Sequence, residues 1–178
     1  MSRYALPVLG FAAHSGVGKT TLLCKLLPLL RARGLRIGMI KRAHHDFDID
    51  IPGKDSYELR KAGATQILVA SQQRQALITE TNDGPDPQLN DLLQRLDHHN
   101  LDVVLVEGFK KEGFPKIELH RPSLGAALLS TTDHSIIAIA TDEPLSAHPP
   151  VPILDLNDAA GIVSFIVQTF RLDASEAT

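Results

Sequence analysis

The sequence predicts an α/β fold: a mostly parallel sheet flanked by helices, with an antiparallel extension. Three observations predict it. Short apolar runs alternate with amphipathic segments along the chain, which is typical of parallel strands joined by helices. Residues 13–20 (AHSGVGKT) place a glycine-bearing loop between an apolar run and a leucine-striped segment. Aromatic residues make up only 4% of the 178 residues, so aliphatic side chains must build the core.

The first half of the chain opens with a strand, a helix and a second strand. Leu6–Ala12 is almost continuously apolar, as expected of a buried parallel strand. The helix expected over Lys19–Arg33 contains Pro28, which should kink it or end its regular part. A strand over Arg36–Lys41 follows, and then a short helix over Ser56–Lys61.

Two strands in the middle of the chain are expected to form a hairpin. Gln66–Ala70 and Gln75–Glu80 are separated by only four residues, so they should pair antiparallel. The length of the chain suggests one domain, so we expect residues 66–80 to extend the main sheet.

In the second half we expect a helix over Leu89–Leu96, strands over Leu101–Glu107, Lys116–His120, Ile136–Thr141 and Ile153–Leu156, a helix over Asp158–Thr169, and a frayed tail over 173–178.

Residues 13–20 match a phosphate-binding P-loop, except that Ala13 stands where the pattern has glycine. Gly16 and Gly18 allow backbone N–H groups to curl around an anion, and the start of the next helix adds its positive dipole end. Lys19 should reach the β- and γ-phosphates, and the Thr20 hydroxyl should bind Mg²⁺. The predicted nucleotide-binding residues here are Ser15, Gly16, Val17, Gly18, Lys19, Thr20 and Thr21.

Two carboxylates join Thr20 as predicted metal ligands. Glu107 ends an apolar strand, where P-loop proteins hold Mg²⁺ or its water; aspartate is usual there, and a surface glutamate is the alternative interpretation. Asp55 closes a long charged stretch, Arg42–Ser56, that could act as a switch segment meeting the Mg²⁺–phosphate group.

Two other metal sites in the charged stretch are not favoured. Asp46–Asp50 begins like a calcium loop, but Ile51 replaces the required glycine and Tyr57 the required glutamate. His44 and His45 have no cysteine partners and no helical i, i+4 spacing, so a solvated charged loop is favoured over a zinc site.

Asp142 follows the strand over Ile136–Thr141 and has two interpretations. Many guanine-binding P-loop proteins place an aspartate at such a point to accept hydrogen bonds from the base. The full Asn-Lys-x-Asp motif is absent, and Asp142 could equally cap a turn before Pro144. Both interpretations stay open.

Composition limits the partners and the compartment. The net charge of −3 does not favour binding to nucleic acid or to an anionic membrane surface. Cys24 is the only cysteine, which fits a reducing compartment. No apolar run approaches the roughly 20 residues of a membrane span, and the N-terminus lacks a signal-peptide layout, so we expect a cytoplasmic protein.

Four segments together resemble the MobB family of molybdopterin-guanine dinucleotide biosynthesis. They are GFAAHSGVGKTTLL, HHDFDIDIPGKDSYELRKAGA, LVEGFK and ATDEPL, in that order, and the resemblance runs from about Leu6 to Phe165. The PGKDSYELRKAGA and VEGFK segments make it specific, since a P-loop alone would not.

The resemblance implies a GTP-binding accessory protein of molybdenum-cofactor maturation. It implies GTP and Mg²⁺ as ligands and weak GTPase activity. It also implies a homodimer formed through an extended part of the sheet. The implied partner is the guanylyltransferase MobA, and molybdopterin-bearing proteins are further candidate partners. Carried onto this chain, it assigns phosphate to Ser15–Thr21 and metal to Thr20, Asp55 and Glu107. No residue stands out as a general base. His14 occupies the position of a signature lysine in dimerising relatives, which puts fast catalysis in doubt.

The alternative hypothesis is a P-loop kinase or ligase that uses ATP on a small acceptor. Such kinases usually carry a lid rich in arginine. The cationic cluster here, Lys110, Lys111, Lys116 and Arg121, is mostly lysine and suits bidentate phosphate binding poorly. A purely structural protein with a vestigial P-loop is disfavoured because Lys19 and Thr20 are intact.

Overall fold

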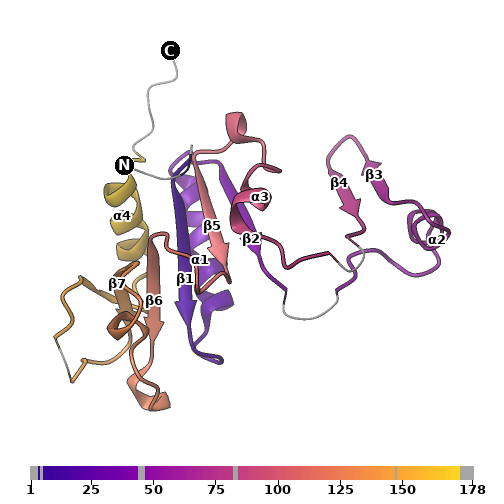
Figure 1. Cartoon of the computed structure of the whole chain (residues 1–178). Coiled ribbons are helices and arrows are strands. Elements are labelled where there is room, and N and C mark those ends of the chain that lie inside the picture. The colour runs from indigo at the N-terminus through magenta and orange to yellow at the C-terminus, as the bar shows by residue number, and fades with distance from the viewer. Residues whose placement is uncertain (1–3, 5, 44–46, 82–83, 147, 173–178) are drawn as a thin grey trace. The chain divides into compact units, whose positions relative to one another are not determined.

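The computed structural model describes residues 4, 6–43, 47–81, 84–146 and 148–172. The chain forms two compact units, one of residues 1–42 with 89–178 and the other of residues 43–88 (Figure 1). The predicted tail over 173–178 and the histidines at 44 and 45 lie outside the described residues. No helix among the described residues is long and apolar enough to span a bilayer.

The larger unit is built on a six-stranded sheet in the order β2-β5-β1-β6-β7-β8. Every neighbouring pair in it is parallel, which confirms the predicted α/β class. Its strands are β1 (Val8–Ala13), β2 (Ile37–Lys41), β5 (Val103–Glu107), β6 (Lys116–His120), β7 (Ile136–Thr141) and β8 (Ile153–Asp155). The helices of this unit are α1 (Lys19–Ala32), α3 (Leu89–Leu93) and α4 (Ala159–Phe170), with 3₁₀ turns η1 (His98–Asn100), η2 (Pro122–Leu124) and η3 (Leu129–Thr131).

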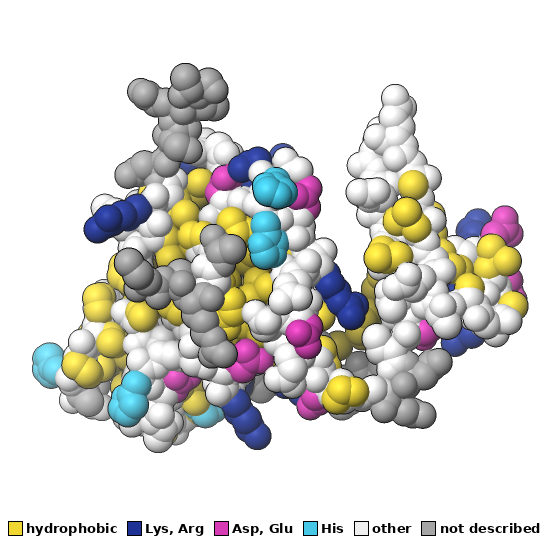
Figure 2. All heavy atoms as spheres, turned by 45° about the horizontal axis from the view of Figure 1, so that its top comes forward, with side chains coloured by type: hydrophobic (Ala, Val, Ile, Leu, Met, Phe, Trp, Pro, Cys, Tyr) yellow, Lys and Arg dark blue, Asp and Glu magenta, His cyan; other side chains and the backbone are white. Residues whose placement is uncertain are grey.

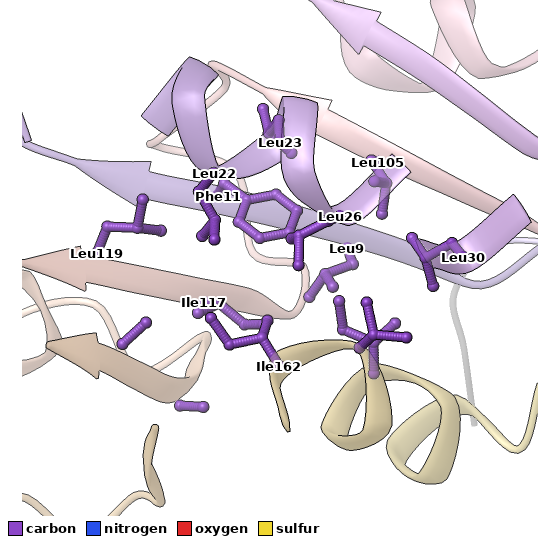
Figure 3. Packing of buried hydrophobic residues seen from close by; sticks show 14 of the residues in the cluster. Leu9, Phe11, Leu22, Leu23, Leu26, Leu30, Leu105, Ile117, Leu119 and Ile162 are labelled. Carbon is purple, nitrogen blue, oxygen red and sulfur yellow. The ribbon is translucent and has the colours of Figure 1, made fainter. Parts of the chain in front are cut away.

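Alternating side chains bury both faces of the sheet. Leu105 of β5 packs in a cluster with residues of α1 and α4, whereas its neighbours Val104 and Val106 pack in a second cluster with α3. Figure 3 shows the first cluster, in which Phe11 of β1 lies among leucines of α1 and Ile162 of α4. Because β1 and β5 are buried on both faces, their carboxyl ends are held by packing on either side.

Helix α1 does not end at Pro28, in contrast to one of the two sequence-based possibilities. It runs on to Ala32, and Gly34, with φ of 80°, follows its end. Pro28 lies on the exposed side of the helix, while Leu26 and Leu30 are fully buried. The apolar stripe therefore holds the helix together across a residue that donates no backbone hydrogen bond.

The smaller unit contains α2 (Asp55–Lys61), β3 (Gln66–Ala70) and β4 (Gln75–Thr79). β3 and β4 pair antiparallel as predicted, but they form a two-stranded sheet of their own instead of extending the six-stranded sheet. The short turn over 71–74 fixes the local pairing of the two strands. Pairing with another sheet depends on contacts distant in sequence, which a hairpin pattern does not encode.

Arg60 holds the segments of the smaller unit together. Its side chain is only 9% exposed and pairs with Asp48 at 2.7 Å, Glu80 at 2.7 Å and Asp50 at 3.8 Å. The hydrogen bonds that Arg60 donates, first to Asp48 and then to Glu80, raise the pKa of Arg60 above its ordinary value. Arg60 thus engages two of the carboxylates that the sequence offered as metal ligands, Asp48 and Asp50.

Candidate nucleotide-binding site

The P-loop lies where β1 ends and α1 begins. Gly16 and Gly18 have φ of 81° and 100°, conformations that glycine adopts without steric cost. No side chain caps the first turn of α1, so its backbone N–H groups are available to an anion. The loop encloses a hollow of about 300 Å³ lined by His14, Ser15, Gly16, Val17, Gly18, Lys19, Thr20 and Thr21.

Glu107 lies beside the P-loop because β5 is a direct neighbour of β1, with Phe11 opposite Glu107 in the register. The Glu107 carboxylate lies 3.6 Å from Lys19 Nζ and 3.9 Å from Lys41 Nζ. Its side chain is 16% exposed, so one carboxylate is held among cations at the phosphate loop. Lys19, Thr20 and Glu107 therefore lie at one end of the sheet, where the P-loop motif and the end of the apolar strand before Glu107 led us to expect them.

The turn after β5 brings another lysine to the loop. Gly108 and Phe109 both have positive φ, 105° and 55°. The next residue, Lys110, donates a hydrogen bond from Nζ to the carbonyl of Ala13 at 2.9 Å. This contact joins the turn to the first residue of the P-loop.

Arg121 connects the P-loop to Asp142. Its Nε donates to the Val17 carbonyl at 2.9 Å, and its Nη1 is bonded to Asp142 Oδ2. The other oxygen, Asp142 Oδ1, is buried without a hydrogen-bond partner among the described residues. Sequence reasoning placed Arg121 only in a loose cationic cluster. The signal that could have found it is its place directly after β6, the second neighbour of β1.

A second hollow, of about 230 Å³, lies at the same end of the sheet. Its lining includes His120 and Pro122 next to Arg121, and Leu145 and Ser146 a few residues after β7. His14 contacts the lining of this second hollow, since its Nε2 is bonded to the carbonyl of Ala127 at 3.0 Å. The His14 side chain is therefore bonded within its own chain.

Asp55 lies in the smaller unit, whereas Thr20 and Glu107 lie in the larger one. It is the exposed first residue of α2. The neighbouring Ser56 hydroxyl is already engaged, because it donates to Asp50 Oδ1 at 2.9 Å. A role for Asp55 at the metal stays a prediction.

Lys116 does not belong to the cationic cluster that the sequence suggested. It is 1% exposed, and its Nζ donates to the Glu112 carbonyl, Asp133 Oδ2 and Ser135 Oγ at 2.6–3.0 Å. All three ammonium protons thus have partners inside the protein. This removes one of the four cations on which a kinase-like phosphate lid would depend.

Known proteins similar to this chain belong to one family. The family model described as "MobB: Molybdopterin guanine dinucleotide synthesis protein B" matches residues 8–142. The chain is 54% identical to the molybdopterin-guanine dinucleotide biosynthesis adapter protein of Escherichia coli over 92% of this chain and 93% of that protein. It is 43% identical to the protein of the same name from Haemophilus influenzae, over 90% and 88%.

A solved structure shares the fold. It is the crystal structure of a molybdopterin-guanine biosynthesis protein B, with a TM-score of 0.72 and 26% identity, over 92% of this chain and 99% of that one. The matched residues 8–142 run from β1 through the P-loop and Glu107 to Asp142. The family match, the relatives and the shared fold together show that this chain belongs to the MobB family.

Proposed function

We propose that this chain is a GTP-binding adapter in molybdopterin-guanine dinucleotide biosynthesis, assisting a guanylyltransferase (MobA) that joins GMP to molybdopterin. Two relatives named as adapter proteins of this biosynthesis support the role. Mg²⁺ would accompany the nucleotide, and intrinsic hydrolysis of GTP would be slow. Molybdopterin-bearing proteins are further candidate partners.

The observation that carries the proposal is the P-loop hollow with Lys19 and Glu107 at its edge. Free N–H groups of α1, the Lys19 ammonium and the Thr20 hydroxyl supply donors and a metal ligand suited to a nucleotide phosphate chain. Glu107 supplies a carboxylate at 3.6 Å from Lys19, where a Mg²⁺ ion or its water would be held. Slow hydrolysis is proposed because the two side chains at the hollow that could act as bases are already engaged, His14 with the Ala127 carbonyl and Glu107 with Lys19.

Guanine selectivity is assigned to Asp142. Its buried Oδ1 has no hydrogen-bond partner among the described residues, and such an atom can accept from the N–H groups of guanine. Arg121 holds the other oxygen and, through the Val17 carbonyl, ties the carboxylate to the P-loop. Adenine presents a different pattern of donors, so this carboxylate would favour GTP over ATP.

We also propose a cytoplasmic homodimer. The exposed free thiol of Cys24 suits a reducing compartment. The β3–β4 hairpin supports self-association, because a two-stranded sheet alone is marginally stable and Leu68 and Leu77, opposite each other in it, are both exposed.

The test is a calorimetric titration of the purified full chain with GTP and with ATP, each with Mg²⁺. We expect GTP to bind more tightly than ATP and Lys19→Ala to weaken GTP binding at least tenfold, because the lysine neutralises phosphate charge. Asp142→Asn should lower the preference for GTP, since an amide replaces one carboxylate acceptor. A wild-type chain that prefers ATP would overturn the guanine assignment and favour the kinase hypothesis.

A further inference from the structure

The turn that follows β5 is held in a strained conformation. Phe109 has φ of 55°, which is rare for a bulky residue and costs of the order of 1–3 kcal/mol. Gly108 before it has φ of 105° and approaches Arg42 so closely that an added Cβ would lie 2.8 Å from the Arg42 Cβ. Strain of this kind persists only where the surroundings over-determine the backbone.

Packing supplies that constraint. The Phe109 side chain is 4% exposed and lies in the cluster that includes Val8 and Val106, and the Arg42 guanidinium lies 5.5 Å from its ring centre. The backbone N–H of Arg42 also donates to the Glu107 carbonyl at 2.9 Å. The turn is therefore anchored on both sides, and its conformation directs Lys110 toward the P-loop.

The Lys110 ammonium has capacity left for an anion. It donates to one neutral acceptor, the Ala13 carbonyl at 2.9 Å, and no carboxylate pairs with it among the described residues. An ammonium has three donors. Lys116 satisfies all three within the protein, whereas Lys110 is exposed and leaves its other donors to solvent beside the first residue of the phosphate loop.

Strand order indicates which phosphate this charge would meet. In the sheet, β5 lies on one side of β1 and β6 and β7 on the other. Asp142 and Arg121 follow β7 and β6, whereas Glu107 and Lys110 follow β5. A nucleotide with its base toward Asp142 and its phosphates across the P-loop would place its terminal phosphate on the β5 side.

We propose that Lys110 is a second phosphate-binding cation, which exchanges the Ala13 carbonyl for the γ-phosphate of a bound nucleoside triphosphate. This rests on the proposed function in that the P-loop must bind nucleotide, but it does not depend on which base is bound. The lysine acts within its own chain and supplies a charge that His14, bonded to Ala127, does not. The P-loop thereby distinguishes a triphosphate from a diphosphate.

The experiment compares GTP with GDP, and ATP with ADP, by calorimetry on the full chain with Mg²⁺. Lys110→Met should weaken triphosphate binding about tenfold or more, because a charge-assisted hydrogen bond is lost, and change diphosphate binding less than about twofold. Lys110→Arg should recover part of the loss. The matched control is Lys111→Met, which removes the same charge from the exposed neighbouring residue and should change neither affinity.

The outcomes separate the two proposals. Equal weakening of triphosphate and diphosphate in Lys110→Met would show that the lysine only tethers the loop, and an unchanged triphosphate affinity would show that it makes no contact with phosphate; either result overturns the inference. A preference of the wild-type chain for ATP would sink the guanine assignment while the ATP and ADP titrations still test Lys110. Failure of the wild-type chain to bind any nucleotide would overturn both. A thermal melt of each variant confirms that it is folded.

Discussion

At the scale of single residues, Arg121 joins two parts of the site that are far apart in sequence, Val17 in the P-loop and Asp142 after β7. It bonds the Val17 carbonyl with Nε and the Asp142 carboxylate with Nη1. Asp142 is 16% exposed on its side chain, so the ion pair is only partly screened by water. The two side chains should therefore behave as one energetic unit.

We expect a double-mutant cycle to reveal this coupling. Arg121→Met leaves the Asp142 carboxylate without its cation and should lower the free energy of unfolding by about 1–2 kcal/mol. Asp142→Asn should also destabilise the chain, but the double variant should lose less than the sum, by about 0.5 kcal/mol or more. Urea denaturation measures all four proteins. Strict additivity would contradict a direct pair.

The sequence predicted the roles of several residues of the site, but it did not predict which side chains they would contact. Lys19 and Thr20 were assigned from the P-loop motif and Glu107 from its place at the end of an apolar strand, and the structure brings them together. The partners of Arg121 and Lys116 could not be predicted, because their contacts depend on which way side chains point from β6 and its following loop. The spacing of residues along the chain does not show toward which neighbouring strand or loop a side chain points.

At the scale of elements, β5 is fixed at both ends. Glu107 ends it at the P-loop, and Asp102, just before its start, binds Arg36 just before β2. Asp102 Oδ1 accepts from Arg36 Nη2 at 2.7 Å, and Oδ2 accepts from the Arg36 backbone N–H at 2.7 Å and from Nε at 3.1 Å. The pair sets the relation of two neighbouring parallel strands at the end opposite the site.

This pair gives a pH-dependent prediction. The hydrogen bonds from the Arg36 side chain hold the pKa of Asp102 below its ordinary value of 3.8, against the opposing effect of burial. The stabilisation is therefore present above about pH 3.8 and is lost as the pH falls through the lower folded-state pKa. Asp102→Asn should destabilise the chain at pH 7, and its deficit relative to the wild type should shrink below pH 3.8.

Denaturant unfolding measured across this pH range checks the prediction. The control is Asp91→Asn, which makes the same substitution at an exposed aspartate of α3. A deficit of Asp102→Asn that stays constant down to pH 2 would contradict the assignment.

Elements were the best-predicted level of the structure. The bounds expected for β3, β6 and β7 agree with the structure, since residues typical of turns flank those segments in the sequence. The exception at α1, where Pro28 does not end the helix, arises because buried leucines on either side of it maintain the packing. Tertiary contact outweighed local propensity there.

At the scale of the whole molecule, the chain divides into two units of different construction. The larger unit contains both apolar clusters. Figure 2 shows hydrophobic side chains at the surface of the part that carries the hairpin. Exposed large apolar residues of the smaller unit include Phe47, Ile49, Ile51, Leu59, Leu68, Val69 and Leu77. The division was not predicted, because residue composition gave no boundary between the units.

The proposed homodimer leads to a prediction at this scale. Leu68→Lys places a charge on the exposed hairpin face beside Leu77 and should weaken association of two copies about tenfold or more. Light scattering coupled to size-exclusion chromatography, over a range of concentrations, measures the effect. Leu124→Lys is the matched control, an exposed leucine of η2 in the larger unit. A wild-type chain that stays monomeric at high concentration would rule out the dimer.

The construction of the smaller unit has a consequence for its motion. No described residue of 43–88 is buried, so Arg60 and its carboxylates replace an apolar core there. Asp48 and Glu80 are 41% and 34% exposed, so salt weakens their ion pairs with Arg60, whereas it does not weaken the packing around β1 and β5. The amides of β3 and β4 should therefore exchange with deuterium through local opening, faster as ionic strength rises, while those of the central strands exchange only when the whole sheet unfolds. Protection gained by β3 and β4 on adding a partner would then locate its binding surface without any change in the core.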